Sequence, residues 1–404
     1  MIELAIYAIS IVFSFYLAWG MGANDAANPT SGAVGAGAVT MKRAIILFAI
    51  FAAVGGILLG PFVMKTVDRG LVERQQLSSD TVIVGSLTAV LSAAIWVTFS
   101  TWKGMPISTS HAIVGGVIGF GIIVNSSLIK WNNFYIVLLS VIATPILSFL
   151  LAFGLYRFLR SYFQKTRSDR NNFTLVYLLI FILCFATSIS VLNQVLNWGV
   201  AESFLVSFLI SLVFSAVATF GFQKKYGKFE TTQSLAYLVL VSLCFSALAF
   251  GANDMANATG VFVTPTEKIM GRPTLEIMFL LAIVGAAGIA AGAFTWGYKV
   301  INVAAYQVTR LNTLSGAAAG YSSAITVFLF TVVPNALIGF GIPISTTHSA
   351  VGAIIGVGLA MRGSAGIDRR ITGKILTFWV LTIPAVILLS MALFWLFSHV
   401  LVIV

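Results

Sequence analysis

Residues 22–28 read GANDAAN and residues 251–257 read GANDMAN, so an aspartate stands twice in a sequence that is otherwise almost free of charge. Only 9% of the 404 residues are charged, whereas soluble domains carry about 25%. Apolar runs of about 20 residues, the length that crosses a bilayer as a helix, recur along the chain. The sequence therefore predicts an all-α polytopic membrane protein of the inner or plasma membrane.

Twelve such spans can be drawn along the sequence. We expect them at about 4–21, 44–64, 81–102, 106–124, 133–157, 174–195, 201–222, 233–250, 274–298, 316–338, 343–361 and 374–402. All 23 Lys and Arg then fall in loops or at span ends, and most of them lie on one side of the membrane. Because cytoplasmic loops are the Lys/Arg-rich ones, both termini are predicted outside. The net charge of +11 is thus a signal of topology, with some attraction to anionic lipid, and does not indicate a nucleic-acid partner.

A second motif is also duplicated. GMPISTSHAIVG at 104–115 returns as GIPISTTHSAVG at 341–352, in the same order after the first motif. An odd number of spans separates the two copies, so the repeats are inverted, as in secondary transporters with broken helices and a site near the membrane midplane. We expect a first repeat at 1–157, a second at 233–404, and a cytoplasmic loop plus two extra spans at 158–232.

Asp25 and Asp254 have no Lys or Arg within their spans. An ionised carboxylate inside a membrane costs several kcal/mol (about 2.5–3.5 on insertion scales) unless it is paired, so the missing positive charge is expected from a bound cation. The Gly and Ala around them favour close helix approach or a local break. Sodium suits the many neutral oxygens nearby, whereas proton coupling needs only a titratable Asp or His. The predicted sodium ligands are Asn24, Asp25, Asn253, Asp254, Ser110 and Thr347.

The second motif suits the opposite charge. A proline favours the first turn of a helix, and three hydroxyls follow it at Ser108–Ser110 and again at Ser345–Thr347. Hydroxyls and backbone N–H groups at a helix start bind oxyanions. Two such starts, related by the inverted repeat, could hold one tetrahedral anion beside the cation. His111 and His348 are interpreted as hydrogen-bonded structural residues, and Cys184 and Cys244 as packing residues.

With GAND-x-AN and PIST[ST]H in both halves, the chain resembles the inorganic phosphate transporter (PiT) family of sodium- or proton-coupled symporters. The likeness spans Gly22 to about Met361. It implies a 12-span inverted-repeat fold, inorganic phosphate as the substrate, cation coupling and a homodimer. The chain departs from the family at Ala26 and Pro29, and it replaces the long central loop of animal members by 157–172. The implied phosphate-binding residues are Asp25, Asn28, Ser108, Thr109, Ser110, Asp254, Asn257, Ser345, Thr346 and Thr347.

Other functions fit these residues less well. Sulfate carries no proton to donate, so two carboxylates would repel it, whereas phosphate can donate one. A metal-dependent enzyme inside the membrane would need an acid and a base in dissimilar environments, but the acids and histidines come in matching pairs. A channel suits inverted repeats less well than alternating access does. We therefore predict a sodium–phosphate symporter that uses no cofactor, with a proton-coupled phosphate or sulfate symporter as the alternative.

Overall fold

The computed structural model describes residues 2–165, 169–196, 198–227, 230–270, 275–338 and 344–400. In these residues every regular element is a helix, and Val72 and Ile129 form an isolated antiparallel bridge. Eleven helices there are long and apolar enough to cross a membrane. α1 (Ile2–Asp25) occupies the position of the remaining expected span. The predicted all-α polytopic membrane protein is confirmed.

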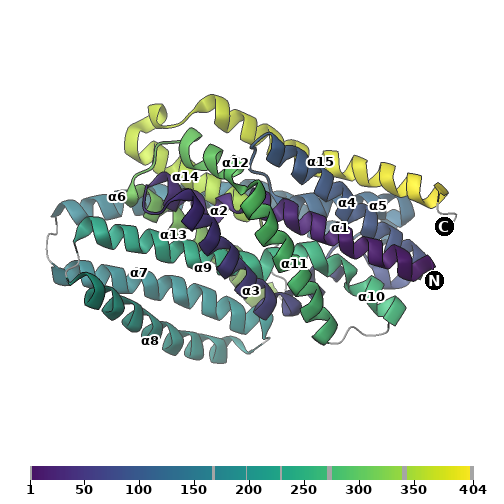
Figure 1. Ribbon diagram of the computed structural model, residues 1–404, viewed down its shortest axis with the longest axis horizontal. Helices are drawn as coiled ribbons and strands as arrows, with labels where there is room; N and C mark the ends of the chain where they lie inside the picture. Colours follow the sequence, from purple (N-terminus) through teal and green to yellow (C-terminus); the bar gives the residue numbers. More distant parts are fainter. Residues whose placement is uncertain are drawn as a thin grey trace.

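The long helices follow the predicted spans closely. After α1 they are α3 (Met41–Arg69), α4 (Ser79–Trp102), α5 (Thr109–Asn125), α6 (Trp131–Lys165), α7 (Asp169–Ser190), α8 (Val200–Tyr226), α9 (Thr231–Thr259), α11 (Leu275–Thr295), α13 (Thr313–Ile338), α14 (Thr346–Arg362) and α15 (Arg369–Val400). Short helices lie between them: α2 (Ala27–Gly35), α10 (Val263–Met270) and α12 (Gly297–Asn302). The chain begins and ends at the same end of the molecule (Figure 1), as an even number of crossings requires.

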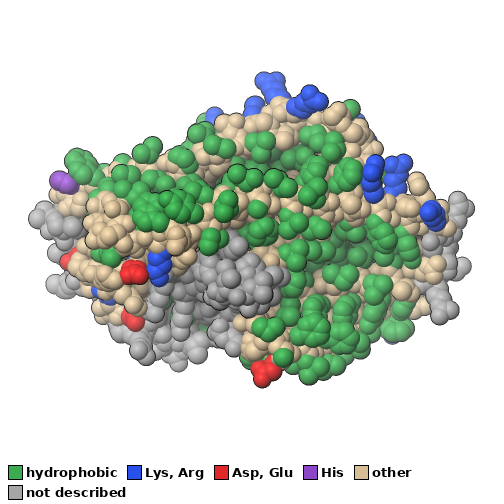
Figure 2. Space-filling model, turned by 180° about the vertical axis from the view of Figure 1, so that it is seen from behind, with side chains coloured by type: hydrophobic (Ala, Val, Ile, Leu, Met, Phe, Trp, Pro, Cys, Tyr) green, Lys and Arg blue, Asp and Glu red, His purple; other side chains and the backbone are tan. Residues whose placement is uncertain are grey.

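The surface agrees with a bilayer environment. Figure 2 shows hydrophobic side chains over most of the described surface in that view. Most of the Lys and Arg in view lie toward its top and right, whereas Asp and Glu lie mainly toward its left, the end that holds the termini. On this face, the acidic side chains therefore lie mainly toward the end of the termini and most of the basic ones lie away from it.

The two halves of the chain are interlocked. α1 packs on α11 and α9 packs on α3, so the first helix of each repeat lies against the second long helix of the other. The same exchange joins α5 to α15 and α14 to α6. Equivalent crossings therefore occur twice in the molecule.

The glycines of the GAND motifs lie at two of these crossings. A Cβ atom on Gly22 would overlap the carbonyl oxygen of Ile289, and one on Gly251 would overlap that of Ala52. The expected close helix approach is thus present in both copies. The alternative, a local break, appears only in the first motif, where Ala26 separates α1 from α2; α9 continues through its motif without interruption.

We expect Gly22→Ala and Gly251→Ala each to lower the thermal stability of the purified protein by several degrees. The added methyl meets backbone rather than a flexible side chain, so the helices must separate, and overpacking of this kind costs about 1–3 kcal/mol. Melting followed by size-exclusion fluorescence measures the effect. Gly154→Ala in α6 is the matched control, because nothing lies within 4 Å of its Cβ position. Equal melting temperatures for all three variants would contradict the close crossings.

The sequence predicts a loop at 157–172, and the structure shows helix in the described part of this stretch instead. α6 continues to Lys165, beyond the predicted end of the first repeat, and α7 begins at Asp169. The described residues of this stretch, 157–165 and 169–172, are therefore helical. The two extra spans are α7 and α8. α8 buries serines at four-residue spacing and exposes apolar side chains such as Phe204 and Val217, as a helix at the protein–lipid boundary would.

Candidate functional site

The second motif places two helix starts side by side. α5 begins at Thr109 and α14 at Thr346, with Ser108 and Ser345 as N-caps. The Ser108 hydroxyl oxygen accepts the N–H of His111 at 3.1 Å, and that of Ser345 accepts the N–H of His348 at 3.0 Å. Each cap uses an oxygen lone pair, so the O–H bond remains able to donate to another acceptor.

Pro106 does not start α5. Pro106 precedes Ser108 in an extended stretch, and its carbonyl accepts the indole N–H of Trp379 at 2.9 Å. The prediction that Pro106 lies in the first helical turn was therefore wrong. Pro343 lies outside the described residues.

Asp25, at the end of α1, is fully buried. Its carboxylate accepts the hydroxyl of Thr109 at 2.6 Å, the hydroxyl of Thr347 at 3.0 Å and the amide of Asn28 at 3.2 Å. One hydroxyl therefore comes from each of α5 and α14. This explains how a carboxylate without a basic partner in its span is solvated inside the protein.

Asp254 repeats this arrangement from α9. Its carboxylate accepts the hydroxyl of Ser110 at 3.2 Å, the hydroxyl of Thr346 at 3.3 Å and the amide of Asn257 at 3.1 Å. Again one hydroxyl belongs to α5 and the other to α14. The two predicted acids thus lie on opposite repeats and share the same pair of helix starts.

The two amides join the halves into one network. Asn28 also donates to the hydroxyls of Thr346 and Thr347 at 3.1 and 3.0 Å. Asn257 donates to the hydroxyl of Ser110 at 2.9 Å. Thr346 is therefore bonded to Asp254 directly and to Asp25 through Asn28. The structure brings together eight of the predicted side chains in this network: Asp25, Asn28, Thr109, Ser110, Asp254, Asn257, Thr346 and Thr347.

Asn24 lies apart from this network. Its amide donates to the Thr101 hydroxyl at 2.9 Å and to the carbonyl of Met105 at 3.0 Å, and its oxygen accepts the N–H of Ile107 at 3.0 Å. These bonds tie the end of α1 to the segment that precedes α5. Asn24 therefore positions the second motif, a role that the sequence alone did not indicate. The side chain of Asn253, its counterpart, lies outside the described part of the structure.

The two histidines meet between the repeats. Their rings are buried, with centroids 5.0 Å apart and planes at 70°. His348 also stacks on Trp379 at 3.8 Å, and its Nδ1 lies 3.3 Å from the carbonyl oxygen of Val141. The contact with Val141 agrees with the interpretation of His348 as a hydrogen-bonded structural residue, whereas the contact given for the His111 ring is the one with His348.

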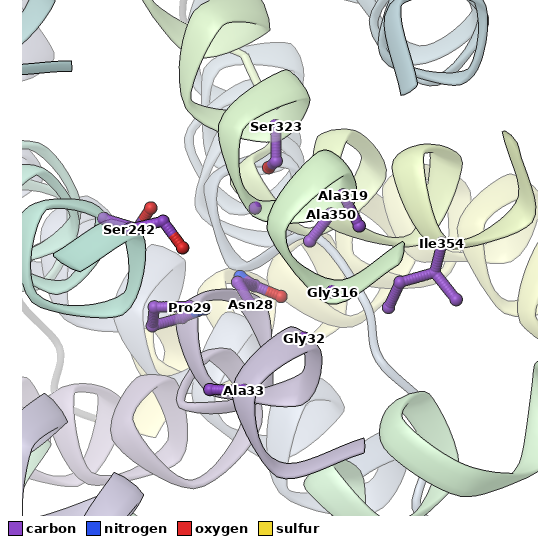
Figure 3. A pocket seen from close by; sticks show the side chains of 12 residues that line it. Asn28, Pro29, Gly32, Ala33, Ser242, Gly316, Ala319, Ser323, Ala350 and Ile354 are labelled. Carbon is purple, nitrogen blue, oxygen red and sulfur yellow. The ribbon is translucent and has the colours of Figure 1, made fainter. Parts of the chain in front are cut away.

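A narrow cavity adjoins the network. It is small and extends from Asn28 in α2 to Ile354 in α14, toward the Arg362 end of that helix. Figure 3 shows Asn28 at its wall, with Ser242 on one side and Ser323 on another. The cavity is lined mainly by small residues of α2, α9, α13 and α14: Asn28, Pro29, Gly32, Ala33, Ser242, Ser246, Gly316, Ala319, Gly320, Ser323, Ala350 and Ile354.

Known proteins share this sequence and this fold. The profile of a family described as "Phosphate transporter family" matches residues 21–390. A protein of Pyrococcus abyssi described as "Putative phosphate permease" is 32% identical, and the alignment covers 96% of each chain. A protein of Haemophilus influenzae with the same description is 31% identical over 93% of each chain.

A solved structure, "The sodium-dependent phosphate transporter", matches with a TM-score of 0.86 and 30% identity, covering 98% of this chain and 99% of the other. Its fold matches the whole arrangement of helices described above. The doubled motifs, the helical membrane fold and these matches agree: the chain belongs to the phosphate transporter family and is a multi-pass membrane transporter, not an enzyme.

Proposed function

We propose that the protein takes up inorganic phosphate by symport with sodium, at one site between the starts of α5 and α14. One observation carries the proposal: each of two buried carboxylates is hydrogen-bonded by hydroxyls from both helix starts. The family and the sodium-dependent structural relative support this assignment.

The carboxylates make cation binding a condition for anion binding. Asp25 and Asp254 lie inside the protein, where opposite or like charges interact more strongly than in water. An anion placed beside two ionised carboxylates would be repelled. A cation on each carboxylate removes that repulsion, so phosphate is expected to enter the site only together with its coupling ions.

The hydroxyls supply a second form of coupling. Each has a single hydrogen, and those of Thr109 and Ser110 are directed to the carboxylates. A sodium ion bound to a carboxylate would also take lone pairs of the neighbouring hydroxyl oxygen. The hydrogen can then turn toward an anion, so cation binding converts carboxylate-binding groups into phosphate-binding groups.

We assign sodium to oxygens of Asp25, Asp254, Ser110 and Thr347, and phosphate to the remaining hydroxyls and amides of the network. Asn253 stays a predicted sodium ligand. We leave Asn24 out, because both amide hydrogens and the oxygen are engaged with the segment before α5. Phosphate is favoured over sulfate because its proton can be donated to a carboxylate oxygen.

The test is radiolabelled phosphate uptake into proteoliposomes at fixed pH. An inward sodium gradient is expected to increase initial uptake at least ten-fold over an equal potassium gradient. An imposed pH gradient without sodium should leave uptake near background. Uptake that follows the pH gradient and ignores sodium would contradict sodium coupling and support the proton-coupled alternative.

We also expect cysteine labelling to place both termini outside, as the loop charges predict. Ser364→Cys, next to the Arg-rich start of α15, should react with an impermeant thiol reagent only from the cytoplasmic side. Ser127→Cys, between α5 and α6, should react only from outside. Both positions are exposed, and the native Cys184 and Cys244 are replaced by Ala beforehand. Labelling of Ser364→Cys from outside would reverse the orientation.

A further inference from the structure

The cavity beside Asn28 has a counterpart on the other side of the site, because the motifs are duplicated. The GAND motifs relate α2 to the region after Asp254, and α9 to α1. The PIST motifs relate α13 to α4, and α14 to α5. Each lining residue of the cavity can therefore be compared with the residue that its repeat partner supplies. The comparison shows which of the two routes to the site is closed.

Most of the small lining residues have larger side chains at their counterpart positions. Gly32 corresponds to Val261, Ala33 to Phe262, Gly320 to Ile83, and Ala350 to Ile113. All four of these larger side chains are buried. The route on the Arg362 side is thus lined by small residues, and the route on the side of the chain termini is packed shut. The two sides therefore differ in packing, as the two halves of an alternating-access cycle would.

Arg74 lies in this closed region. It belongs to the short 3₁₀ helix Arg74–Gln76 between α3 and α4, and its side chain is only 2% exposed. Its Nη1 donates to the hydroxyl of Ser86 at 3.2 Å and to the carbonyl of Val261 at 2.9 Å. The guanidinium carbon lies 5.4 Å from the centroid of the Phe120 ring.

These contacts link the elements that would have to separate for the route on the side of the termini to open. Ser86 is on α4 and corresponds to Ser323, a lining residue of the cavity; Val261 corresponds to Gly32, another lining residue. Phe120 is on α5, the helix that carries Thr109 and Ser110. One cationic side chain therefore joins α4, α5 and the segment after α9 across the closed route.

The Arg74 guanidinium can bind an anion as well as hold the outer route closed. Its planar array of five N–H donors matches two oxygens of a phosphate, and bonds to an anion are roughly twice as strong as bonds to neutral acceptors. A phosphate that enters from the side of the termini would offer this array charged oxygens in place of the Ser86 hydroxyl and the Val261 carbonyl. Exchange of these acceptors would release the three elements from one another.

We propose that Arg74 is a second phosphate-binding residue, outside the central site. It closes the outer route when bonded to Ser86 and Val261, and it opens the route by transferring its hydrogen bonds to the entering phosphate. This rests on the proposed phosphate transport. It adds that the substrate itself releases the outer gate.

The test separates entry from binding at the central site. Arg74→Gln should raise the KM for external phosphate at least ten-fold in proteoliposomes, while calorimetric phosphate binding in detergent with sodium stays within two-fold. Arg74→Lys, which keeps the charge and loses the planar array, should lie between. Lys268→Gln is the matched control: this cation lies at the same end and bonds the Leu77 carbonyl. An unchanged KM in Arg74→Gln, or an equal rise in Lys268→Gln, would overturn the proposal.

Labelling tests the gate directly. Val117 is buried in the closed route and corresponds to Ile354, which lines the cavity. Val117→Cys should resist an external impermeant thiol reagent until phosphate and sodium are added. Combined with Ser86→Ala, which removes one acceptor without changing the arginine, it should react several-fold faster without phosphate. This variant tests the gate even if the Arg74 substitutions prevent folding.

Equal labelling rates with and without Ser86→Ala would contradict the gate. The sodium dependence of phosphate binding, measured on the same preparations, keeps the two proposals apart. Its loss would refute sodium symport while leaving the effect of Arg74 on KM intact. Normal sodium dependence with no effect of Arg74→Gln on KM would refute only the gate.

Discussion

Asp25→Asn and Asp254→Asn are each expected to reduce sodium-driven phosphate uptake to background, at least a hundred-fold below wild type. Each change removes the charge that holds a coupling cation, while the amide keeps the size of the side chain. The folded protein should survive, because the change also removes a buried charge, and thermal stability should stay equal or rise. Uptake in proteoliposomes and melting of the purified variants measure the two effects.

Asp80→Asn serves as the control for the aspartates. Asp80 lies in the first turn of α4, where it complements the helix dipole, away from the network around Asp25. It should transport at the wild-type rate. Sodium-driven uptake close to wild type in either Asp25→Asn or Asp254→Asn would show that the carboxylates do not hold the coupling ions.

Thr109→Val and Thr346→Val should each weaken phosphate binding by about ten-fold. A hydrogen bond to a charged acceptor contributes about 1.5–3 kcal/mol, and 1.4 kcal/mol is a factor of about ten. Sodium binding should weaken as well, because the two ligands favour each other by linkage. Calorimetry in detergent, at several sodium concentrations, gives both affinities.

The double variant tests whether the two repeats share one site. Thr109 bonds Asp25, and Thr346 reaches Asp25 through Asn28, so the two effects should not add. Thr326→Val is the control, because this buried threonine donates its hydroxyl to the Ser322 carbonyl of its own helix. Two independent phosphate sites, or additive losses, would refute a shared site.

Much of this site could be predicted from the sequence because both motifs occur twice. An uncompensated aspartate in an apolar segment indicates a bound cation wherever it stands, and its repetition identifies the second copy. The hydroxyl runs could be assigned to helix starts from the same pattern. Spacing alone did not show that Thr109 and Thr347, from different repeats, would bond the same carboxylate.

Other features depend on three-dimensional contacts that leave little trace in the sequence. Asn24 occupies a motif position, but its partners lie far along the chain, so its positioning role was missed. The stretch after Arg157 was interpreted as a loop because of its charge. It is helical up to Lys165 because Arg, Leu, Gln and Lys favour helices and no Gly or Pro interrupts them there. Arg74 gave no signal, since a charge in a short connection is ordinarily at the surface.

The exchange of helices between the repeats has a consequence for biosynthesis. The surface of α1 around Gly22 packs against α11, which leaves the ribosome more than two hundred residues later. The first half must therefore wait in the membrane with its contact surfaces covered by lipid or by assembly factors. Neither half made alone can complete its own crossings. Two separately expressed halves should regain activity only when produced together.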